Sequence, residues 1–489
     1  MPSQEWEFYG RHDELASLEE VLGRGRWFFV KVSGRRRIGK TRLVRQALRP
    51  EQRGKVLYVQ IPDSDPAGVV STARDFMKMF GITTDLPTDL RTLATRIGSL
   101  CEAGWVVALD EFQYFQRGAL YEFTSQLQSE VDRLSAMADR VPGGLVVLGS
   151  LHTEMAALLE DRSAPLYNRL TDAIELGHLD IGSILEMLRA HADTEPERLL
   201  FLWNLFEGVP KFYRDCFEQG VIAGDRRAVL RQMFFSSSSP LRTEAEHGFL
   251  HELRGRYDLV LKYVASHPGA TNADIVAHVR TVEPDSEKQA GSYLKILDER
   301  YQMIERLQPV FAKSSARSGR FYIRDNFLRS WLAALAVPVA STSFRPVDGL
   351  VAEADARLAD AEGHGLERLV AALYAERSRK GIGDFSLTST VRGWWDKSGT
   401  EIDLVALDDD NERIRLGTCK RSAARLVDDL GRFDGHVERF LAAFPRYANW
   451  QVERVAIAPR LSPEQREVVR GRGYLPQDLE ELTAGLAPE

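Results

Sequence analysis

The chain has 489 residues, of which 44% are hydrophobic and 28% are charged, a globular composition with enough length for about three domains. Its formal net charge of −7 excludes a chain that is basic throughout, so any contact with nucleic acid must be local. Three widely spaced cysteines argue against a disulfide scaffold, and no apolar run reaches the roughly 20 residues of a membrane helix, so we expect a cytoplasmic protein with no membrane partner.

Short apolar runs mark the strands expected in the first part of the chain. Amphipathic helical stretches separate these runs, and strands that are apolar on both faces and alternate with helices form a parallel sheet covered by helices. We therefore expect a doubly wound α/β domain over residues 1–180 and a helical lid over residues 181–240. The expected strands lie at residues 26–34, 56–61, 105–109, 145–148 and 173–176.

A glycine-rich segment follows the first expected strand. Residues 34–41, GRRRIGKT, fit the pattern GxxxxGK[ST] between a strand and a helix. Backbone N–H groups of such a loop surround phosphates, Lys40 can reach the β- and γ-phosphates, and the Thr41 hydroxyl can bind Mg²⁺. Residues 23–50 hold ten Lys or Arg and no Asp or Glu, which also favours a polyanion. The predicted ATP-binding residues of the loop are Gly34, Arg35, Arg36, Arg37, Ile38, Gly39, Lys40, Thr41 and Arg42.

Two adjacent acids, Asp110 and Glu111, end the third apolar run. Beside a phosphate loop, we expect Asp110 to hold Mg²⁺ together with Thr41, and Glu111 to polarise the attacking water. A strand that ends in a polar turn would show the same two acids without this role. Lys40 and Glu111 are the predicted catalytic residues of ATP hydrolysis.

Further motifs resemble the archaeal-type ATPase family of prokaryotes, an AAA+ and STAND-like group that is allied to the origin-recognition ATPases. The segment FYGRHDEL at residues 8–15 resembles the Gly-Arg box of these ATPases, and similar stretches occur at residues 148–150, 165–169 and 207–213. The resemblance covers roughly residues 5–335. It implies ATP and Mg²⁺ as ligands.

The same resemblance implies roles for single residues. Gly10 and Arg11 would lie near the adenine and ribose, and Ser150 would take the sensor position after the fourth strand. Arg169 would stabilise charge on the transferred phosphoryl group, with a packed surface arginine as the alternative. Pro210 belongs to a Gly-Val-Pro turn that resembles the lid motif of STAND proteins, and an ordinary turn between helices is the alternative.

Residues 251–335 have the helix, helix, helix, hairpin order of a winged helix. They carry 13 Lys or Arg against 10 Asp or Glu, so this region is mildly basic in an acidic chain, and we expect phosphate contacts with DNA. A winged helix that packs against protein is the alternative, because Glu283, Asp285 and Glu287 crowd the start of the third helix. The predicted DNA contacts are Lys288, Ser292 and Lys295 on that helix, and Lys313, Arg317 and Arg320 on the wing.

Linkers are expected at residues 236–240 and 338–350, and residues 361–489, beyond the second of these, resemble a PD-(D/E)XK nuclease domain. A helix acid, Glu367, a strand acid, Asp403, and a strand-end lysine, Lys420, form the resemblance. Carboxylates of this kind would hold Mg²⁺ while the lysine orients water. Thr418 stands where the pattern has a second acid, which weakens the expected metal affinity, and Glu401 lies on the same strand face as Asp403. A further strand is expected at residues 384–390.

Three readings of the whole chain remain open from the sequence. The first is an ATPase that acts on DNA through its winged helix and nuclease-like tail. The second is an ATP-gated regulatory switch or scaffold that binds protein partners or forms a homo-oligomer. The third is a DNA nuclease that the ATPase controls.

Overall fold

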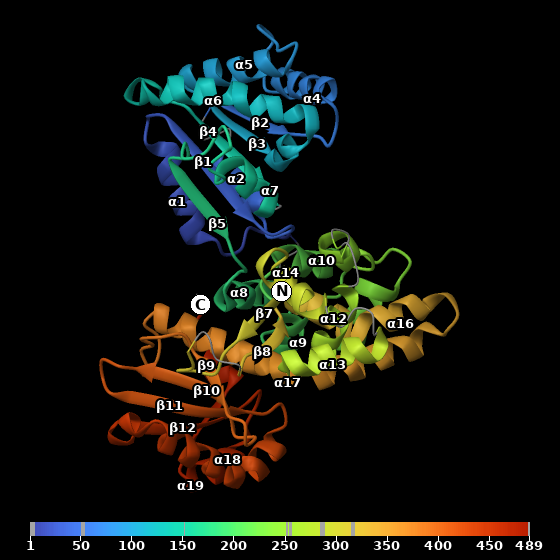
Figure 1. The fold of residues 1–489 in the computed structure, drawn as a ribbon, viewed down its shortest axis with the longest axis vertical. Coiled ribbons are helices and arrows are strands. Elements are labelled where there is room, and N and C mark those ends of the chain that lie inside the picture. Colours follow the sequence, from blue (N-terminus) through green and yellow to red (C-terminus); the bar gives the residue numbers. More distant parts are fainter. Residues whose placement is uncertain are drawn as a thin grey trace. The chain divides into compact units, whose positions relative to one another are not determined.

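The computed structural model describes residues 5–49, 54–150, 152–250, 253, 257–283, 289–313 and 318–487. It divides into two compact units (Figure 1). The N-terminal unit comprises Arg11–His178 together with Val209–Lys211. The C-terminal unit comprises Met1–Gly10, Leu179–Gly208 and Phe212–Glu489.

The N-terminal unit is built on the five-stranded parallel sheet that the sequence predicts. The strand order is β2-β3-β4-β1-β5, and every strand is mostly apolar because helices cover the sheet. Since all strands run the same way, the loops that follow them open at one edge, where ligands of such folds bind. The strands are β1 (Phe28–Gly34), β2 (Val56–Gln60), β3 (Val106–Asp110), β4 (Gly144–Gly149) and β5 (Asp172–Leu176).

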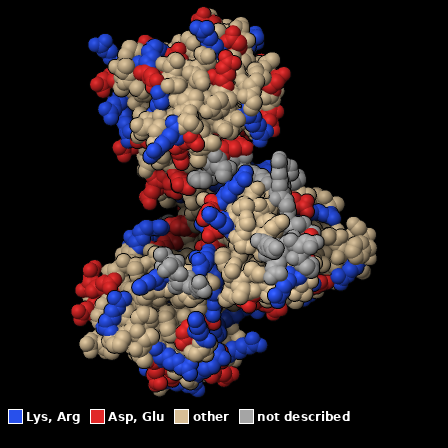
Figure 2. All heavy atoms as spheres, viewed as in Figure 1, with Lys and Arg blue, Asp and Glu red and all other residues tan. Residues whose placement is uncertain are grey.

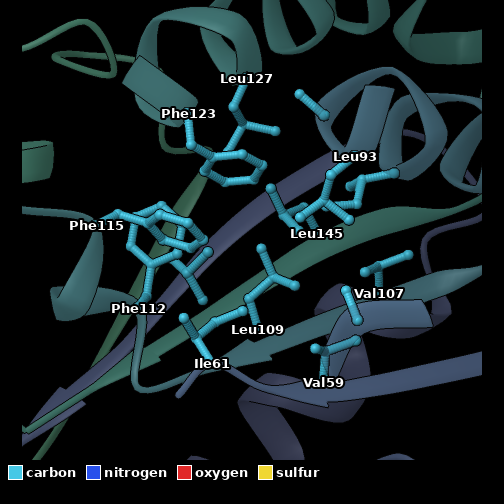
Figure 3. Close-up of a cluster of buried hydrophobic side chains, with 14 of the residues drawn as sticks. Val59, Ile61, Leu93, Val107, Leu109, Phe112, Phe115, Phe123, Leu127 and Leu145 are labelled. Atoms are coloured by element: carbon cyan, nitrogen blue, oxygen red, sulfur yellow. The ribbon is translucent and has the colours of Figure 1, made fainter. Parts of the chain in front are cut away.

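Helices and a large hydrophobic core support this sheet. In this core, the rings of Phe115 and Phe123 stack with centroids 4.1 Å apart, next to Phe112 (Figure 3). Each buried phenylalanine contributes about 2 kcal/mol, so this core holds the segment directly after Glu111 in place. The helices are α1 (His12–Gly23), α2 (Lys40–Ala47), α4 (Pro66–Met79), α5 (Leu90–Glu102), α6 (Glu122–Ser135) and α7 (His152–Leu159), with 3₁₀ turns η1 (Phe112–Gln116), η2 (Gly118–Tyr121) and η3 (Ala138–Arg140).

The C-terminal unit begins with the helices that were expected as a lid. Asp180 and Asp225 cap two of them by accepting backbone N–H bonds in the first turn. The elements are α8 (Ile181–His191), α9 (Pro196–Phe206), α10 (Pro210–Glu218), α11 (Arg226–Leu230) and the π-helical turns η4 (Arg231–Phe235) and η5 (Glu246–Leu250).

Residues 257–323 contain three helices, a short strand and a hairpin. The three strands form an antiparallel sheet in the order β6-β8-β7. Buried residues of all three helices form one core with the sheet, among them Leu261, Ile275 and Leu297. The elements are α12 (Tyr257–Ser266), β6 (Ala270–Thr271), α13 (Asn272–Val282), α14 (Ala290–Glu299), β7 (Ile304–Leu307) and β8 (Arg320–Ile323).

The linker expected at residues 338–350 is largely helical. A 33-residue helix, α17 (Val347–Arg379), begins inside it, directly after Pro346. Leu350, Val351, Ala354 and Leu358 are buried at helical spacing, and this burial overrides the loop-like composition of the preceding residues. The preceding elements are α15 (Asn326–Ser330), η7 (Trp331–Leu335), α16 (Ala336–Ala340) and η8 (Ser341–Ser343).

The chain ends in a second five-stranded sheet, of order β13-β12-β11-β10-β9. Strands β9, β10 and β11 pair antiparallel, and β11, β12 and β13 pair parallel. The strand expected at residues 384–390 is wrong, because that segment is irregular and the edge strand lies later. The elements are β9 (Arg392–Trp395), β10 (Glu401–Asp408), β11 (Arg413–Cys419), α18 (Ala423–Ala443), η9 (Pro445–Asn449), β12 (Gln451–Ala458), α19 (Pro463–Gly471), β13 (Leu475–Asp478) and α20 (Leu479–Thr483).

Candidate functional site

The phosphate loop connects β1 to α2 at the carboxyl edge of the parallel sheet. Gly34 has a φ of +145°, and a Cβ at this position would lie 2.5 Å from the carbonyl oxygen of Leu176. Gly39, with a φ of +100°, directly precedes the first turn of α2. Only glycine adopts these conformations without strain, so the backbone shape of the loop depends on both residues.

Lys40 is the buried cation of this loop. Its Nζ donates to the carbonyl oxygens of Gly34 and Arg35, both at 2.8 Å. Burial lowers the pKa of Lys40 to about 8, although the charges of Glu111 and Asp110 oppose the shift. A bound anion would restore the ordinary pKa, so the loop favours a negatively charged ligand.

The other basic residues of the loop differ in exposure. Arg36 is exposed, whereas Arg35, Arg37 and Arg42 are partly buried. Arg35 Nη1 lies 3.1 Å from Nε2 of His178, which follows β5. Ile38 is fully buried and anchors the loop to the unit.

The structure brings Thr41 and the two acids together. Thr41 Oγ1 donates to Asp110 Oδ2 at 2.8 Å, although 69 residues separate them in sequence. Asp110 Oδ1 accepts the backbone N–H of Glu111 at 2.8 Å. A carboxylate and a hydroxyl are oxygen ligands of the kind that Mg²⁺ takes beside phosphates, so this donor set fits a magnesium ion.

Two polar residues of this site were missed in the sequence. Tyr58 on β2 donates its hydroxyl hydrogen to Asp110 Oδ2, and Gln113 in η1 donates its amide to Glu111 Oε2. Both side chains are buried. Tyr58 stands in an apolar strand and Gln113 in an aromatic stretch, so only the side-chain geometry distinguishes them from core residues.

Arg11 and Pro210, two residues that the family resemblance singled out, lie against the loop. Arg11 Nη2 donates to the carbonyl oxygens of Gly177, at 2.5 Å, and Ile38, at 3.4 Å. Pro210 belongs to the N-terminal unit, and its Cγ would lie 3.6 Å from a Cβ on Gly39.

Gly10 and Ser150 have different surroundings. Gly10 belongs to the C-terminal unit and packs so closely on Ser183 that a Cβ would come within 2.3 Å of its Oγ. Ser150 directly follows β4 and is partly buried, at the strand end where the sensor residue was expected.

Arg169 does not reach the phosphate loop of its own chain. Its guanidinium forms a two-pronged ion pair with Asp132 on α6, at 2.7 and 3.0 Å. Two residues later, Thr171 bonds Phe29, at the start of β1, whereas the phosphate loop follows the end of β1. A strand of this length separates the two ends by roughly 20 Å, so a role in phosphoryl transfer would require a second copy of the chain.

The predicted DNA contacts are only partly described by the structure. Lys288 and Arg317 lie outside the described residues. Ser292 and Lys295 are exposed on α14, where Lys295 Nζ lies 3.8 Å from Glu299, and Lys313 is exposed in the segment between β7 and β8. On the face shown in Figure 2, basic and acidic side chains are interspersed.

The hairpin that was expected as a DNA-binding wing contacts the last domain of its own unit. Val310 N–H donates to Gly393 O on β9 at 3.0 Å, and Phe311 packs against Tyr447 with ring centroids 5.3 Å apart. Arg320 lies over the ring of Trp395 and binds Glu401 Oε1 at 2.5 Å. Among the predicted wing residues, Arg320 is therefore engaged within the chain, whereas a DNA-binding wing would leave it open to phosphates.

A second polar cluster contains Glu367 of α17, Asp403 of β10 and Lys420, which follows β11. Thr418 Oγ1 donates to Asp403 Oδ2 at 3.0 Å, the backbone N–H of Cys419 donates to the same oxygen at 2.8 Å, and Lys420 Nζ lies 3.5 Å from it. The structure therefore assembles this predicted set, and Thr418 acts as a hydrogen-bond donor to Asp403.

The electrostatics of the second cluster reflect crowded acids. Burial, with the charge of Glu401, raises the pKa of Glu367 to about 7, and His364 Nδ1 lies 3.2 Å from its Oε2. Burial, with the charge of Glu367, raises the pKa of Asp403 to about 6. Burial lowers the pKa of Lys420, but the negative charges of Asp403 and Glu367 raise it, and the resulting pKa lies above the ordinary value.

Comparisons with known proteins support the fold of this chain. No protein-family model matches it. Over 421 residues it is 21% identical to an uncharacterized protein of Methanocaldococcus jannaschii, a match that covers 83% of this chain and 85% of that protein. It is also similar to the solved structure of a Walker-type ATPase of Pyrococcus abyssi, with a TM-score of 0.50, 19% identity, and coverage of 68% of this chain and 98% of that one. A further similarity is to the ORC2 protein of Aeropyrum pernix, with a TM-score of 0.44, 13% identity, and coverage of 74% and 96%.

The chain shares the fold of the Pyrococcus abyssi protein, and its N-terminal unit is an α/β unit built on a five-stranded parallel sheet. Among the described residues, no helix combines the length and apolar character that crossing a membrane requires.

Proposed function

We propose that this chain binds Mg-ATP at the phosphate loop and hydrolyses it. The observation that carries the proposal is the assembly of Lys40, Thr41, Asp110 and Glu111 at the carboxyl edge of a parallel sheet, with Thr41 and Asp110 in direct hydrogen bond. An anion-binding loop and a carboxylate pair at one edge are the parts that phosphoryl transfer needs.

The residues of the loop fit a triphosphate with its metal ion. Backbone N–H groups of residues 34–41 line the start of α2, and the buried Lys40 ammonium lies among carbonyl oxygens that phosphate oxygens could replace as partners. Thr41 and Asp110 would hold Mg²⁺, which supplies charge neutralisation on the phosphates.

Different residues of the chain then have separate roles in the reaction. Lys40 stabilises negative charge on the terminal phosphate, and the start of α2 orients the chain of phosphates. The carboxylate of Glu111 accepts a proton from water and directs that water toward the terminal phosphate. Arg11 holds the loop in shape through its bond to Ile38 O.

Phosphate release by the purified chain tests this proposal. We expect Lys40→Ala to lose nucleotide binding, and Glu111→Gln to keep binding while its turnover falls at least 100-fold, because glutamine cannot accept the proton. Wild-type turnover in Glu111→Gln would contradict the role of Glu111 as base.

We further propose that turnover drives a conformational change and that the chain acts on DNA. The exposed Ser292 and Lys295 on α14 and the exposed Lys313 support this, whereas Arg320 is engaged with Glu401. Salt-sensitive DNA binding that weakens in Lys295→Ala, and ATP turnover that DNA stimulates, are expected. ATP turnover that is indifferent to DNA would instead favour a regulatory switch that binds a protein partner or a second copy of the chain.

A second candidate function is metal-dependent cleavage of DNA by the acid cluster. The observation that favours it is the convergence of Glu367, Asp403 and Lys420 from one helix and two strands. Oxygen ligands of this kind suit Mg²⁺ or Mn²⁺, and Lys420 would orient the attacking water. We expect cleavage of duplex DNA with Mn²⁺ that Asp403→Asn abolishes and Lys40→Ala leaves intact. Absence of cleavage with either metal would leave the cluster without a catalytic role.

A further inference from the structure

Asp110, which ends β3, and Glu111, which follows it, are each held by a separate buried side chain. We propose that Tyr58 and Gln113 are positioning residues with different tasks: Tyr58 sets the affinity for Mg²⁺ through Asp110, and Gln113 sets the rate of hydrolysis through Glu111. This inference rests on the proposed ATPase function.

Tyr58 and Thr41 share one oxygen of Asp110. Both hydroxyl groups donate to Oδ2, while Oδ1 accepts the backbone N–H of Glu111, so the carboxylate is fixed by three donors. The parallel pairing of β2 and β3 sets Tyr58 opposite Ala108, two residues before Asp110. The guanidinium of Arg45 lies over the Tyr58 ring, 4.8 Å from its centroid, and packs α2 against β2 at this point.

The hydroxyl of Tyr58 carries the proton that it donates to Asp110. Burial and the neighbouring charge of Asp110 raise the pKa of Tyr58 well above its ordinary range, so the phenol keeps its proton. A carboxylate beside a metal ion loses affinity when its outer hydrogen-bond partners are removed, typically by 10- to 100-fold. Tyr58 is such a hydrogen-bond partner of Asp110.

Gln113 binds the second acid, Glu111. Its side chain is 2% exposed, and its amide nitrogen donates to Glu111 Oε2. A Cβ on Gly149, at the end of β4, would come within 2.8 Å of Gln113 Oε1, so the glycine leaves room for the amide. Glu111 itself has a φ of +58°, a left-handed backbone conformation, and its carboxylate is held by the amide of Gln113. Fixing the base in one orientation increases the rate without any contact with the metal.

Two near-isosteric variants separate the tasks in the full-length chain. Tyr58→Phe and Gln113→Leu are titrated with Mg²⁺ at a fixed concentration of a fluorescent ATP analogue, and kcat is measured at saturating Mg²⁺ and ATP. We expect Tyr58→Phe to raise the Mg²⁺ concentration for half-maximal binding about tenfold and to change kcat little. We expect Gln113→Leu to leave that Mg²⁺ midpoint unchanged and to lower kcat about tenfold.

The controls separate positioning from loss of structure. Tyr121→Phe removes a hydroxyl from a partly buried tyrosine of the same unit and should leave both quantities unchanged. Thermal melting shows whether each variant folds, and Gln113→Met replaces Gln113→Leu if the latter does not.

Three results would overturn the inference. These are an unchanged Mg²⁺ midpoint in Tyr58→Phe, an unchanged kcat in Gln113→Leu, or equal changes of both quantities in both variants. A wild-type chain that binds no Mg-ATP would contradict the proposed ATPase function instead, so the two failures are distinguishable.

Discussion

The phosphate loop and the acid cluster both place carboxylates near a lysine, but burial dominates the pKa shift of the lysine in the first site and of the acids in the second. In the N-terminal unit, burial lowers the pKa of Lys40, so the cation is the group in need of a counter-charge. In the C-terminal unit, burial raises the pKa of Glu367 and Asp403, so the acids need a cation. The first site is therefore prepared for an anion and the second for a cation.

The two sites also differ in how many of their residues are close together in the sequence. A single eight-residue segment supplies most groups of the phosphate loop, and neighbouring parallel strands add the acids. The acid cluster instead combines α17, β10 and the residue after β11, and a hairpin from residues 304–323 adds Arg320. A site of the second kind depends on packing between elements far apart in the chain.

Replacing the lysine of each site with alanine gives the largest expected difference between the two sites. Lys40→Ala should weaken ATP binding by at least 100-fold, because a buried cation beside the phosphates is lost. Lys420→Ala should leave ATP binding unchanged. Isothermal titration with ATP measures both, and equal losses in the two variants would remove the distinction between the sites.

The pH dependence of ATP affinity tests the state of Lys40. The free protein loses the Lys40 proton near pH 8, whereas a bound phosphate would keep it, so binding takes up a proton. ATP affinity should therefore fall as the pH rises above 8, by up to about tenfold per unit. Dissociation constants between pH 7 and 9.5 measure this. The residual affinity of Lys40→Arg should stay level, because arginine keeps its charge.

Arg320 offers a way to alter the second site alone. This arginine already neutralises part of the acid cluster through Glu401, so Arg320→Gln should raise the affinity for Mn²⁺ by about three- to tenfold. Mn²⁺ titration followed by paramagnetic resonance measures the change. Arg324→Gln, on the same chain segment but paired with Asp298, serves as the matched control. A fall in Mn²⁺ affinity would contradict the proposed competition between cations.

The smallest expected effect is on stability. The folded-state pKa values of Glu367 and Asp403 are raised, so the folded state binds these protons more tightly than the unfolded state does. The resulting contribution to stability is fully present below the unfolded-state pKa values near 4, and it is lost as the pH rises through 6 to 7. The Tm of the C-terminal unit should fall by roughly 2–4 °C between pH 5 and 8. Glu367→Gln should reduce the dependence of Tm on pH, as measured by scanning calorimetry. An unchanged dependence of Tm on pH would mean that Glu367 ionises freely.

The parallel sheet could be predicted because its signals are local. Strands β1 to β4 lie where apolar runs predict them, since a strand buried on both faces is largely apolar, and the expected fifth strand, β5, lies at the sheet edge with alternating burial. Helix α17 could not be predicted in full, because its first half is stabilised by burial of Leu350, Val351 and Leu358 against distant elements. The irregular segment at residues 384–390 has the composition of a strand, but β9 takes the sheet edge instead.

By itself, the sequence determined the phosphate loop and the two acids at the end of β3, because glycine conformation, helix start and strand end are encoded in adjacent residues. Tertiary structure alone decided which distant groups meet these residues. It set Tyr58 on Asp110 through the pairing of β2 with β3, paired Arg169 with Asp132, and turned the expected wing onto the last domain. Such partners depend on strand order and side-chain packing between remote segments, and no local pattern of residues encodes them.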